Sequence, residues 1–424
     1  MSSTSPGDSS TSDRSRTPLA PFVDHFEGSI DGVRLPPGPV YSTHNGRPIL
    51  VRYDLTGVRR AVSREMPAGR TSGLWRIREL LPVLEGDEIS LGEVATPLIP
   101  CAKTGRRFGL EHVWIKDESL LPTGSFKSRG QAVAMSMAKA SGIRRVAIPT
   151  AGNAGGAMAA YAARAGLEAW VFMPEDTPAV NRMEAALAGA HVFLVEGLID
   201  ECGRIVAAGK DRVGWFDFST LKEPYRLEGK KTMGFELAEQ FGWELPDVIL
   251  YPTGGGTGLI GMWKAFQELA EIGWIDPSRL PRMVAVQSEG CCPVVRAYES
   301  GERFCQPFEN ANTIARGIRV PGAIGDFLIM DAIRESGGRA IAVQESRIES
   351  WMRQATADEG ISVCPESATC IGALEMLADS GWIGPQDRVV IFNCASARKY
   401  SDLIDLRLPK LKNAAAVDWD QLTS

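Results

Sequence analysis

Short apolar runs rich in β-branched residues alternate with Ala-rich runs of helical length from about residue 96 onward. The strand-like runs read "HVWIKDE", "RRVAIPT", "EAWVFMP", "AHVFLVEG", "DVILYPT", "MVAVQSE", "GRAIAVQE" and "RVVIFNCAS". The helix-like runs between them read "GQAVAMSMAKA", "GGAMAAYAARAG", "AVNRMEAALAG", "GLIGMWKAFQELAEIG" and "ATCIGALEMLADSG". A strand followed by a helix, repeated many times, predicts parallel α/β sheets with helices on both faces.

The number of these units sets the expected fold class. About eight of them over roughly 300 residues predict an α/β protein with two open, mostly parallel twisted sheets and a cleft between them. The chain of 424 residues also exceeds the size at which one hydrophobic core keeps growing, which favours two domains. In such folds, ligands bind beyond the carboxyl ends of the strands.

Shifts in composition suggest where the domains begin and end. Residues 19–95 form an irregular N-terminal extension with Pro and Gly clusters and one polar helical stretch, "GLWRIRELLPVL". We expect an N-terminal α/β domain at 96–225 and a C-terminal α/β domain at 226–412. The Ser/Thr/Pro-rich residues 1–18 lack an apolar stretch, which is typical of a disordered tail and not of a signal peptide. Residues 413–424 are expected to form a C-terminal tail.

Three unusual turns each follow a predicted strand and precede a predicted helix. They read "LPTGSFKSRG" at 121–130, "PTAGNAGGA" at 149–157 and "YPTGGGTGL" at 251–259. Because the carboxyl ends of parallel strands meet at one edge of a sheet, these turns are expected to border the cleft.

The third turn is suited to a compact phosphate group. Its glycines leave the backbone free to direct several N–H groups at one anion where a helix begins. The residues concerned are Gly254, Gly255, Gly256 and Gly258, with Thr257 as an added hydroxyl donor. The chain has neither the GxxxxGK[ST] of a P-loop nor a GxGxxG at a first strand, which argues against a nucleoside triphosphate or a dinucleotide. The alternative is a plain Gly-rich turn.

The second turn offers backbone donors and one amide side chain, Asn153. A loop of this kind at a helix N-terminus suits a carboxylate, and the amide can donate to a phenolic oxygen. The alternative is that Asn153 is simply a helix N-cap, since Asn is a favoured capping residue.

The first turn carries Lys127, with Phe126 before it and Arg129 two residues on. A Schiff-base lysine needs an environment in which burial and neighbouring cations lower its pKa. The alternative is one more solvated lysine. An amine, a phosphate cradle and a donor to an aromatic ring together describe a site for pyridoxal 5'-phosphate.

The motifs "SFKSRG", "TAGNAGG" and "PTGGGTG", in this order, resemble those of the fold-type II pyridoxal-phosphate enzymes, whose fold is tryptophan synthase β-like. Within them the chain is most similar to threonine synthase and its relatives. The segments "SGLWRIRELLPV", "LGEVATPL", "FSTLKEPYRLEGKKT" and "VCPESATCIGAL" extend the resemblance over roughly residues 26–400.

The resemblance implies a role for each matching residue. Lys127 would form the Schiff base and move protons at the substrate's α and β carbons, and Asn153 would hydrogen-bond the coenzyme's phenolic oxygen. The glycine loop would hold the coenzyme phosphate. The substrate carboxylate would bind at the turn that contains Thr150, Ala151, Gly152, Ala154 and Gly155. The phosphate of O-phosphohomoserine would bind at Ser219, Thr220 and Arg226; an arginine with two hydroxyl groups is also a chemically sensible clamp for a dianion.

Several positions depart from the family pattern. Ala154 stands where threonine synthases usually have a threonine whose hydroxyl touches the substrate phosphate. In the run "FNCASARKY" the resemblance implies that the partner of the pyridine nitrogen would be Cys394, with Ser396 as second choice, and a thiol is a weak hydrogen-bonding group. The segment "FEGSIDG…STHNGRPILVRYDL" is similar to a zinc ribbon with its cysteines lost, and we expect no metal. The positions that replace those cysteines are Gly28, Asp31, Ser42 and Asn45.

The net charge and the cysteine pattern limit the kinds of binding partner and the cell compartment that we expect for this protein. The net charge of -6 gives no electrostatic reason to bind nucleic acid or an anionic membrane, and no run of about 18 apolar residues predicts a membrane span. The eight cysteines are scattered without a CxxC, which favours a reducing cytoplasm. Glu366, at the start of a predicted helix near the cleft, is interpreted as a favourable placement of an acid at a helix N-terminus. The family resemblance further implies a homodimer.

Three interpretations of the function remain open from the sequence. The first is a threonine synthase, which turns O-phospho-L-homoserine and water into L-threonine and phosphate. The second is a paralogue that performs β-elimination or β-replacement on serine, threonine or O-phosphoserine, as in a specialised pathway. The third is a non-catalytic amino-acid-binding relative, which an intact Lys127, Asn153 and glycine loop argue against. The set of Ser219, Thr220 and Arg226 favours the first interpretation, whereas Ala154 and the altered run at 393–397 favour the second.

Overall fold

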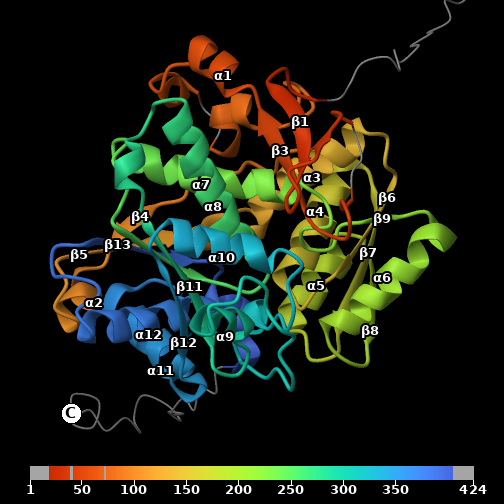
Figure 1. Ribbon diagram of the computed structural model, residues 1–424. Helices are drawn as coiled ribbons and strands as arrows, with labels where there is room; N and C mark the ends of the chain where they lie inside the picture. Colours follow the sequence, from red (N-terminus) through yellow and green to blue (C-terminus); the bar gives the residue numbers. More distant parts are fainter. Residues whose placement is uncertain (1–18, 39–41, 71–72, 404–424) are drawn as a thin grey trace, which may run out of the picture.

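The computed structural model describes residues 19–38, 42–70 and 73–403, and the two expected tails lie outside these ranges. The described chain contains three sheets: a three-stranded sheet of order β2-β1-β3, a six-stranded sheet of order β12-β11-β10-β13-β5-β4 and a four-stranded sheet of order β8-β7-β6-β9 (Figure 1). The strands are β1 (Val23–Gly28), β2 (Arg34–Leu35), β3 (Ile49–Tyr53), β4 (Leu98–Pro100), β5 (His112–Asp117), β6 (Arg145–Pro149), β7 (Glu168–Pro174), β8 (His191–Val195), β9 (Phe216–Asp217), β10 (Val248–Pro252), β11 (Arg282–Ser288), β12 (Arg339–Val343) and β13 (Arg388–Asn393).

The helices follow the strands as the hydrophobic pattern predicts. The α-helices are α1 (Leu55–Ala61), α2 (Ala102–Arg107), α3 (Lys127–Ala140), α4 (Asn153–Ala165), α5 (Ala179–Leu187), α6 (Ile199–Val213), α7 (Tyr225–Gln240), α8 (Thr257–Glu271), α9 (Pro293–Glu299), α10 (Asp326–Glu335), α11 (Ile348–Glu359) and α12 (Pro365–Asp379). The short 3-10 helices are η1 (Met66–Gly69), η2 (Leu74–Leu80), η3 (Glu118–Leu120), η4 (Pro277–Arg279), η5 (Arg316–Ile318), η6 (Glu345–Arg347) and η7 (Ala397–Leu403).

All eight strands predicted from the apolar runs are present, and the expected fold class of two open, mostly parallel sheets is confirmed. In the six-stranded sheet only β4 runs antiparallel to its neighbour, and every pairing in the four-stranded sheet is parallel. The expected boundary at residue 225 does not separate the two sheets, because β4 and β5, which precede it, pair in the six-stranded sheet. The domain limits themselves stay a prediction.

Side chains of the central strands alternate between two hydrophobic clusters, as the two-residue period of a strand requires. In β10, Val248 and Leu250 belong to the cluster under α11 and α12, whereas Ile249 belongs to the larger cluster on the other face. In β6, Ile148 packs in the larger cluster with α4, and Ala147 faces α6. Helices therefore cover both faces of the two larger sheets, and α7 packs lengthwise against α8 (Figure 1).

The N-terminal extension is more regular than the sequence suggests. Strands β1, β2 and β3 form an antiparallel sheet, and "GLWRIRELLPVL" contains the 3-10 helix η2, kinked at Ile77, in place of an α-helix. Strand β1 reads "VDHFEG" and β2 has only two residues, so neither is marked by an apolar run of the kind that predicts the strands of the larger sheets. The hydroxyl of Tyr53 donates to the carboxylate of Glu228 at 2.6 Å, which ties this sheet to α7.

Three of the four positions expected to replace zinc-ribbon cysteines lie together. The carboxylate of Asp31 contacts the His44 ring at 3.0 Å and the Asn45 amide at 3.3 Å, and a Cβ on Gly28 would collide with Asp31 and His44. Across residues 19–38, 42–70 and 73–403, no group of three or more His, Cys, Asp or Glu side chains is placed to hold a metal ion. The absence of zinc remains a prediction.

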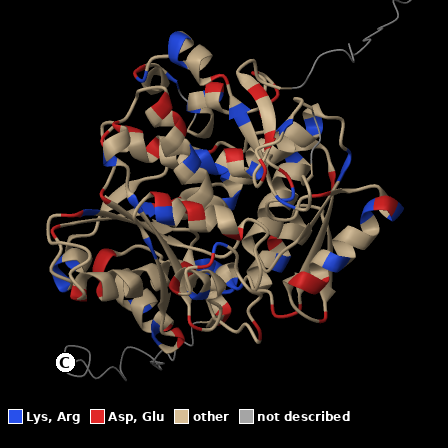
Figure 2. Cartoon of the chain, viewed as in Figure 1, with Lys and Arg blue, Asp and Glu red and all other residues tan. Residues whose placement is uncertain are grey.

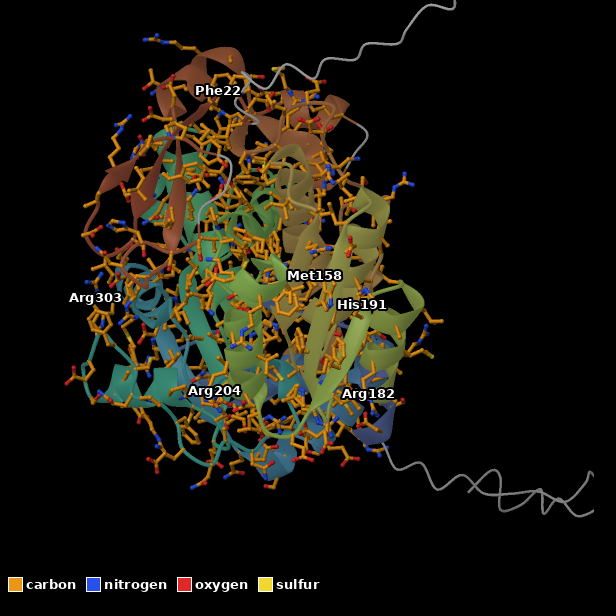
Figure 3. The ribbon with its side chains drawn as sticks, turned by 90° about the vertical axis from the view of Figure 1, so that its right-hand side faces the viewer. Phe22, Met158, Arg182, His191, Arg204 and Arg303 are labelled. Atoms are coloured by element: carbon orange, nitrogen blue, oxygen red, sulfur yellow. The ribbon has the colours of Figure 1, made fainter. Side chains whose placement is uncertain are left out.

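Charged residues of both signs are interspersed in the view of Figure 2, including on α7 and α8 near the middle of the molecule. There the carboxylates of Glu228 and Glu268 pair with the ammonium groups of Lys231 and Lys264 at 2.5 to 2.9 Å, all buried. On the outside, β8 forms one edge of the four-stranded sheet and α6 packs on its face; His191 of β8 and Arg204 of α6 are labelled in Figure 3. Within the described ranges no helix is long and apolar enough to span a bilayer.

Candidate active site

A cavity of about 490 Å³ lies beyond the carboxyl ends of strands from both large sheets. Its wall includes the segments that follow β5, β6 and β10, as the position of the three turns predicts. It also includes segments after β9 and β13 and residues 316–324 between α9 and α10. The cavity is lined by most of the residues singled out from the sequence: Phe126, Lys127, Thr150, Ala151, Gly152, Asn153, Ala154, Ser219, Thr220, Arg226, Gly254, Gly255, Gly256, Thr257, Gly258 and Cys394.

Two of the residues expected at the site lie outside the cavity lining. Ser396 contacts the hydroxyl of Ser362 at 3.1 Å. Gly155 faces the sheet, where an added Cβ would lie 2.6 Å from a methyl of Thr150 and 2.7 Å from one of Val171. Gly155 thus permits close packing of α4 on β7, and of the two candidates for the pyridine nitrogen only Cys394 faces the cavity.

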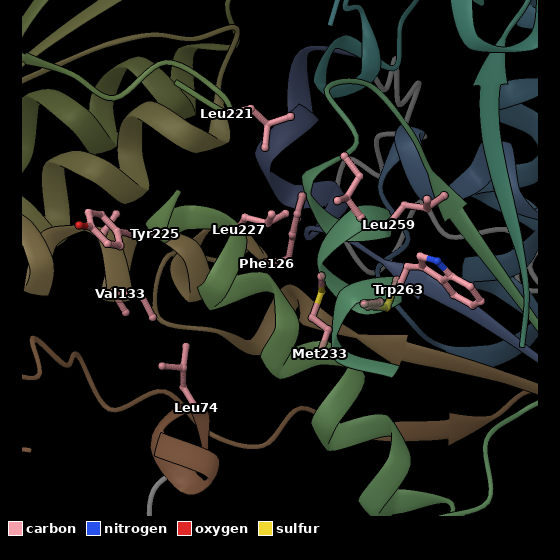
Figure 4. Close-up of a cluster of buried hydrophobic side chains, with 14 of the residues drawn as sticks. Leu74, Phe126, Val133, Leu221, Tyr225, Leu227, Met233, Leu259 and Trp263 are labelled. Carbon is pink, nitrogen blue, oxygen red and sulfur yellow. The ribbon is translucent and has the colours of Figure 1, made fainter. Parts of the chain in front are cut away.

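Lys127 is the first residue of α3, and its amine lies 3.9 Å from the ring centre of Phe126. The Phe126 ring is held among apolar side chains that include Leu227 and Leu259 (Figure 4). Burial and the nearby charge of Arg226 lower the pKa of Lys127 to about 8. A substantial fraction of this amine is therefore neutral near physiological pH, as a Schiff-base lysine requires.

The cation that acts on Lys127 is not the one that lies closest in sequence. Arg129 is fully buried on the far side of α3, where its guanidinium pairs with Glu118 at 2.6 Å and with Glu236 at 2.7 Å. Residues two apart on a helix point in different directions, so Arg129 turns away from the cavity. Arg226, a residue of α7, takes that place instead.

The glycine loop has the shape of an anion cradle at the start of α8. Gly256 has φ +76°, which favours glycine, and α8 begins at Thr257. A Cβ on Gly254 would lie 2.9 Å from a methyl of Val320, and a Cβ on Gly255 would lie 2.9 Å from a methyl of Thr220. The loop therefore has no room for side chains, and its backbone N–H groups are available where the helix dipole favours an anion.

Asn153 is not the N-cap of α4, because that position belongs to Gly152, whose φ is +149°. Its amide nitrogen donates instead to the hydroxyl of Tyr400 at 3.0 Å. The amide oxygen is buried without a hydrogen-bond partner among the described residues. An orphaned buried polar atom of this kind points to a ligand or an ordered water at the site.

Two of the three residues expected to clamp a substrate phosphate, Ser219 and Arg226, already have hydrogen-bond partners. The hydroxyl of Ser219 donates to Asp217, and the guanidinium of Arg226 donates to the carbonyl of Phe218 at 2.7 Å. Burial lowers the pKa of Arg226, and Glu223, 3.9 Å away, counteracts this. A phosphate at this position has to compete with these partners.

Burial raises the pKa of the Cys394 thiol well above its usual range, so the thiol remains protonated; the charge of Lys127 only partly offsets this. A neutral thiol that faces the cavity can act only as a weak hydrogen-bonding group.

Two residues with no role in the sequence-based site also line the cavity. Glu366, the second residue of α12, accepts hydrogen bonds from the Gly317 N–H at 2.7 Å and from the Tyr400 hydroxyl at 2.8 Å. The favourable placement of an acid at a helix start is present, but this carboxylate also faces the cavity and is 4% exposed. The run "CPESA" offered a signal for Glu366, whereas no pattern in the sequence pointed to Tyr400.

A profile of the family described as "Pyridoxal-phosphate dependent enzyme" matches residues 89–395. The chain is 34% identical over 366 residues to a threonine synthase of Methanocaldococcus jannaschii, covering 86% of this chain and 89% of that protein. It is also 34% identical over 341 residues to a threonine synthase of Methanosarcina acetivorans, covering 80% of this chain and 83% of that protein.

Solved structures with a similar fold include maize serine racemase, with a TM-score of 0.64 and 21% identity. That similarity covers 80% of this chain and 95% of the maize protein. A serine racemase from Dictyostelium discoideum has a TM-score of 0.58 and 23% identity, covering 74% of this chain and 93% of that protein. At these identities the similarity speaks for the fold alone.

The residues of the cavity fit pyridoxal 5'-phosphate. Lys127 supplies an amine with a lowered pKa, and the glycine loop supplies a side-chain-free cradle for a phosphate. Asn153 supplies an amide nitrogen whose second proton is not taken by Tyr400, and Cys394 supplies a neutral thiol. Together these groups meet the coenzyme's need for a covalent anchor, an anion site and partners for its ring.

Proposed function

Because the chain belongs to the family of pyridoxal-phosphate-dependent enzymes, we propose that it is a threonine synthase-like lyase that converts O-phospho-L-homoserine and water into L-threonine and phosphate. The observation that carries this proposal is the 34% identity, over 86% of the chain, to a protein named threonine synthase. The intact Lys127, Asn153 and glycine loop argue against a relative that binds amino acids without turning them over.

Balance of the reaction defines what the site has to do. Protons leave the α and β carbons, and phosphate leaves the γ carbon with the electron pair of the carbon–oxygen bond. Protons return to the γ and α carbons, the oxygen of water bonds to the β carbon as a hydroxyl group, and the remaining proton of water is taken up by the departing phosphate. The bound coenzyme supplies the electron sink that makes the α proton acidic.

We assign the proton transfers to Lys127. With a pKa of about 8, its amine can both accept and return a proton near neutral pH. Burial keeps bulk water away from this amine, which protects a reactive carbon from stray protons. The glycine loop would hold the coenzyme phosphate, and Cys394 would face the ring nitrogen.

We assign substrate binding to the two remaining parts of the wall. The turn at residues 150–156 would hold the substrate carboxylate with backbone N–H groups at the start of α4, and Thr220 with Arg226 would neutralise the leaving phosphate. For this, Arg226 has to give up its bond to the Phe218 carbonyl, and Ser219 its bond to Asp217.

The occupied state of Ser219 and Arg226 also supports a second candidate. Three further cations in the cavity wall each have an acidic partner: Lys222 with Asp217, Arg316 with Asp402, and Arg319 with Asp176. Together with Ala154, which has no hydroxyl for a phosphate, these pairs favour a substrate with a smaller or less charged leaving group. Of the paralogue's candidate substrates, serine and threonine fit that description because they lose only a hydroxyl group, whereas O-phosphoserine loses the same phosphate as O-phosphohomoserine.

The test compares four substrates on the purified holoenzyme: O-phosphohomoserine, O-phosphoserine, threonine and serine. Release of phosphate together with an equal amount of threonine from the first substrate supports the proposal. Phosphate from O-phosphoserine alone, or 2-oxo acid from serine or threonine alone, supports the paralogue instead. A Lys127→Ala variant serves as the control and is expected to be colourless and inactive.

The proposal also covers the assembly of the protein and the compartment in which it acts. We expect a homodimer that acts on a small amino-acid substrate in a reducing cytoplasm. All eight cysteines are free, which is consistent with such a compartment. Sedimentation or light scattering of the purified protein tests the assembly.

A further inference from the structure

Asn153, Tyr400 and Glu366 form a hydrogen-bonded chain along the cavity wall. The Asn153 amide nitrogen lies 3.0 Å from the Tyr400 hydroxyl, which lies 2.8 Å from a carboxylate oxygen of Glu366. All three residues line the cavity, and Tyr400 and Glu366 are 3% and 4% exposed. They come from three separate places in the chain, the starts of α4 and α12 and the helix η7.

The number of available protons fixes which group donates and which accepts in this series of hydrogen bonds. A tyrosine hydroxyl has one proton, and a carboxylate can only accept. Burial and the charge of Glu366 raise the pKa of Tyr400 well above its usual range, so the hydroxyl keeps that proton. Because the proton is given to Glu366, the Tyr400 oxygen has to accept from the NH₂ group of Asn153.

This order of donors and acceptors fixes the orientation of the Asn153 amide, with its NH₂ group toward Tyr400. Its NH₂ group has two protons, of which Tyr400 takes one. The second proton of the NH₂ group remains available for an acceptor in the cavity. If Asn153 were rotated so that its oxygen met Tyr400, two acceptors would compete for one proton, which is costly in a buried site.

We propose that Glu366 and Tyr400 are positioning residues that hold the Asn153 amide so that one N–H group faces the phenolic oxygen of the coenzyme. This rests on the role proposed above for Asn153. An N–H donor at that oxygen favours its ionised form. The chain of hydrogen bonds therefore sets both the affinity for the coenzyme and the ionisation of its ring hydroxyl.

Further hydrogen bonds hold this network at Glu366 and beside Tyr400. The carboxylate oxygen of Glu366 that accepts from Tyr400 also accepts from the Gly317 N–H at 2.7 Å. Next to Tyr400, the ammonium of Lys399 donates to the carbonyl of Thr123 at 2.9 Å and to Glu184 at 2.6 Å. These bonds limit the freedom of η7 and α12, so that the orientation persists in solution.

The experiment uses Tyr400→Phe, which keeps the ring and removes only the hydroxyl. Without the Tyr400 hydroxyl, the Asn153 N–H group is no longer held at the phenolic oxygen, and the ionised form of that oxygen loses its donor. In the holoenzyme we therefore expect the visible absorbance band to lose intensity to the near-ultraviolet band. We also expect the dissociation constant of the coenzyme, measured by titrating the apoprotein, to rise about fivefold to tenfold. An unchanged spectrum and an unchanged dissociation constant would overturn the proposal.

Matched variants separate positioning from a loss of packing. Glu366→Gln keeps an acceptor for Tyr400 and should resemble the parent, whereas Glu366→Leu removes the acceptor and should resemble Tyr400→Phe. Tyr53→Phe removes a hydroxyl that donates to a buried carboxylate, Glu228, away from the cavity. It should lower the unfolding temperature without altering the spectrum. A spectral change in Tyr53→Phe as large as that in Tyr400→Phe would contradict a specific role.

The role proposed for Asn153 is tested separately with Asn153→Ala. If this variant changes the spectrum while Tyr400→Phe and Glu366→Leu do not, Asn153 contacts the coenzyme but the positioning chain is wrong. If Asn153→Ala leaves the spectrum unchanged, the contact itself is wrong, and the positioning proposal falls with it.

Discussion

Lys127 and Arg226 are cations from two different helices that line the same cavity, and burial together with the Arg226 charge lowers the pKa of Lys127 to about 8. The ordinary value is 10.5. The arrangement is electrostatically unfavourable for the apoprotein, but it keeps the lysine nucleophilic near neutral pH.

The first prediction concerns the pH at which the coenzyme attaches. Only the neutral amine reacts, so the attachment rate of the apoprotein should rise with pH, with a midpoint near 8. In Arg226→Gln the repelling charge is gone, and the midpoint should move to higher pH. Stopped-flow measurement of the visible absorbance follows the reaction. The exposed Arg204→Gln on α6 is the control, and an equal midpoint in parent and Arg226→Gln would contradict the assigned cause.

The second prediction concerns space in the glycine loop. In Gly254→Ala the new Cβ would lie 2.9 Å from a methyl of Val320 and 3.0 Å from the Cα of Ile318, so the loop has to shift. We expect the coenzyme affinity to fall about tenfold or more, because the phosphate-binding N–H groups move with the loop. Gly322→Ala is a matched control in the same cavity wall, since its Cβ would meet nothing within 4 Å. Titration of both apoproteins measures the difference, and equal affinities would refute it.

The third prediction concerns the buried ion network behind α3. Arg129 is fully buried between Glu118 and Glu236, and Arg129→Met would leave Glu118 without its cation. Loss of one partner from such a network typically lowers the free energy of unfolding by about 3 to 5 kcal/mol. Arg204→Met, on an exposed surface, should change it far less, because exposed ion pairs contribute little to stability. Chemical denaturation measures both, and similar losses in the two variants would argue against the network as a source of stability.

The fourth prediction concerns Glu223, which is buried before the start of α7. Burial raises its pKa to about 7, although the Arg226 charge and two N–H donors counteract the effect. The folded protein therefore binds this proton more tightly than the unfolded chain does. The stability gained from it is complete below a pH of about 4.5 and is lost as the pH rises through about 7.

Glu223→Gln cannot lose a proton, and its amide oxygen can still accept from the N–H groups of Tyr225 and Arg226. Relative to the parent, its free energy of unfolding should be higher at pH 8 than at pH 4.5 by about 1 to 3 kcal/mol. Denaturation at the two pH values measures this change. A benefit that is larger at the lower pH would be inconsistent with a raised pKa.

Most of the two large sheets could be predicted from the sequence. Strands such as β10 and β13 are continuous apolar runs because helices cover both faces, and each is followed by a turn of distinctive composition. The extension could not be predicted in the same way. Its strand β1 spans "VDHFEG" and is stabilised by pairing with β3, and a pairing between distant segments leaves little trace in a short window.

The same distinction between what the sequence predicts and what the tertiary structure decides applies to the candidate site. The sequence alone determined that a lysine, an amide and a glycine loop each stand where a strand gives way to a helix, and the parallel topology brings such turns to one edge. From these residues the coenzyme follows. Only the tertiary structure decided that Arg226 and not Arg129 acts on Lys127, and that Glu366 and Tyr400 join Asn153. These partners lie far apart in the chain, and the direction of a side chain depends on the helix that carries it and on what packs against that helix.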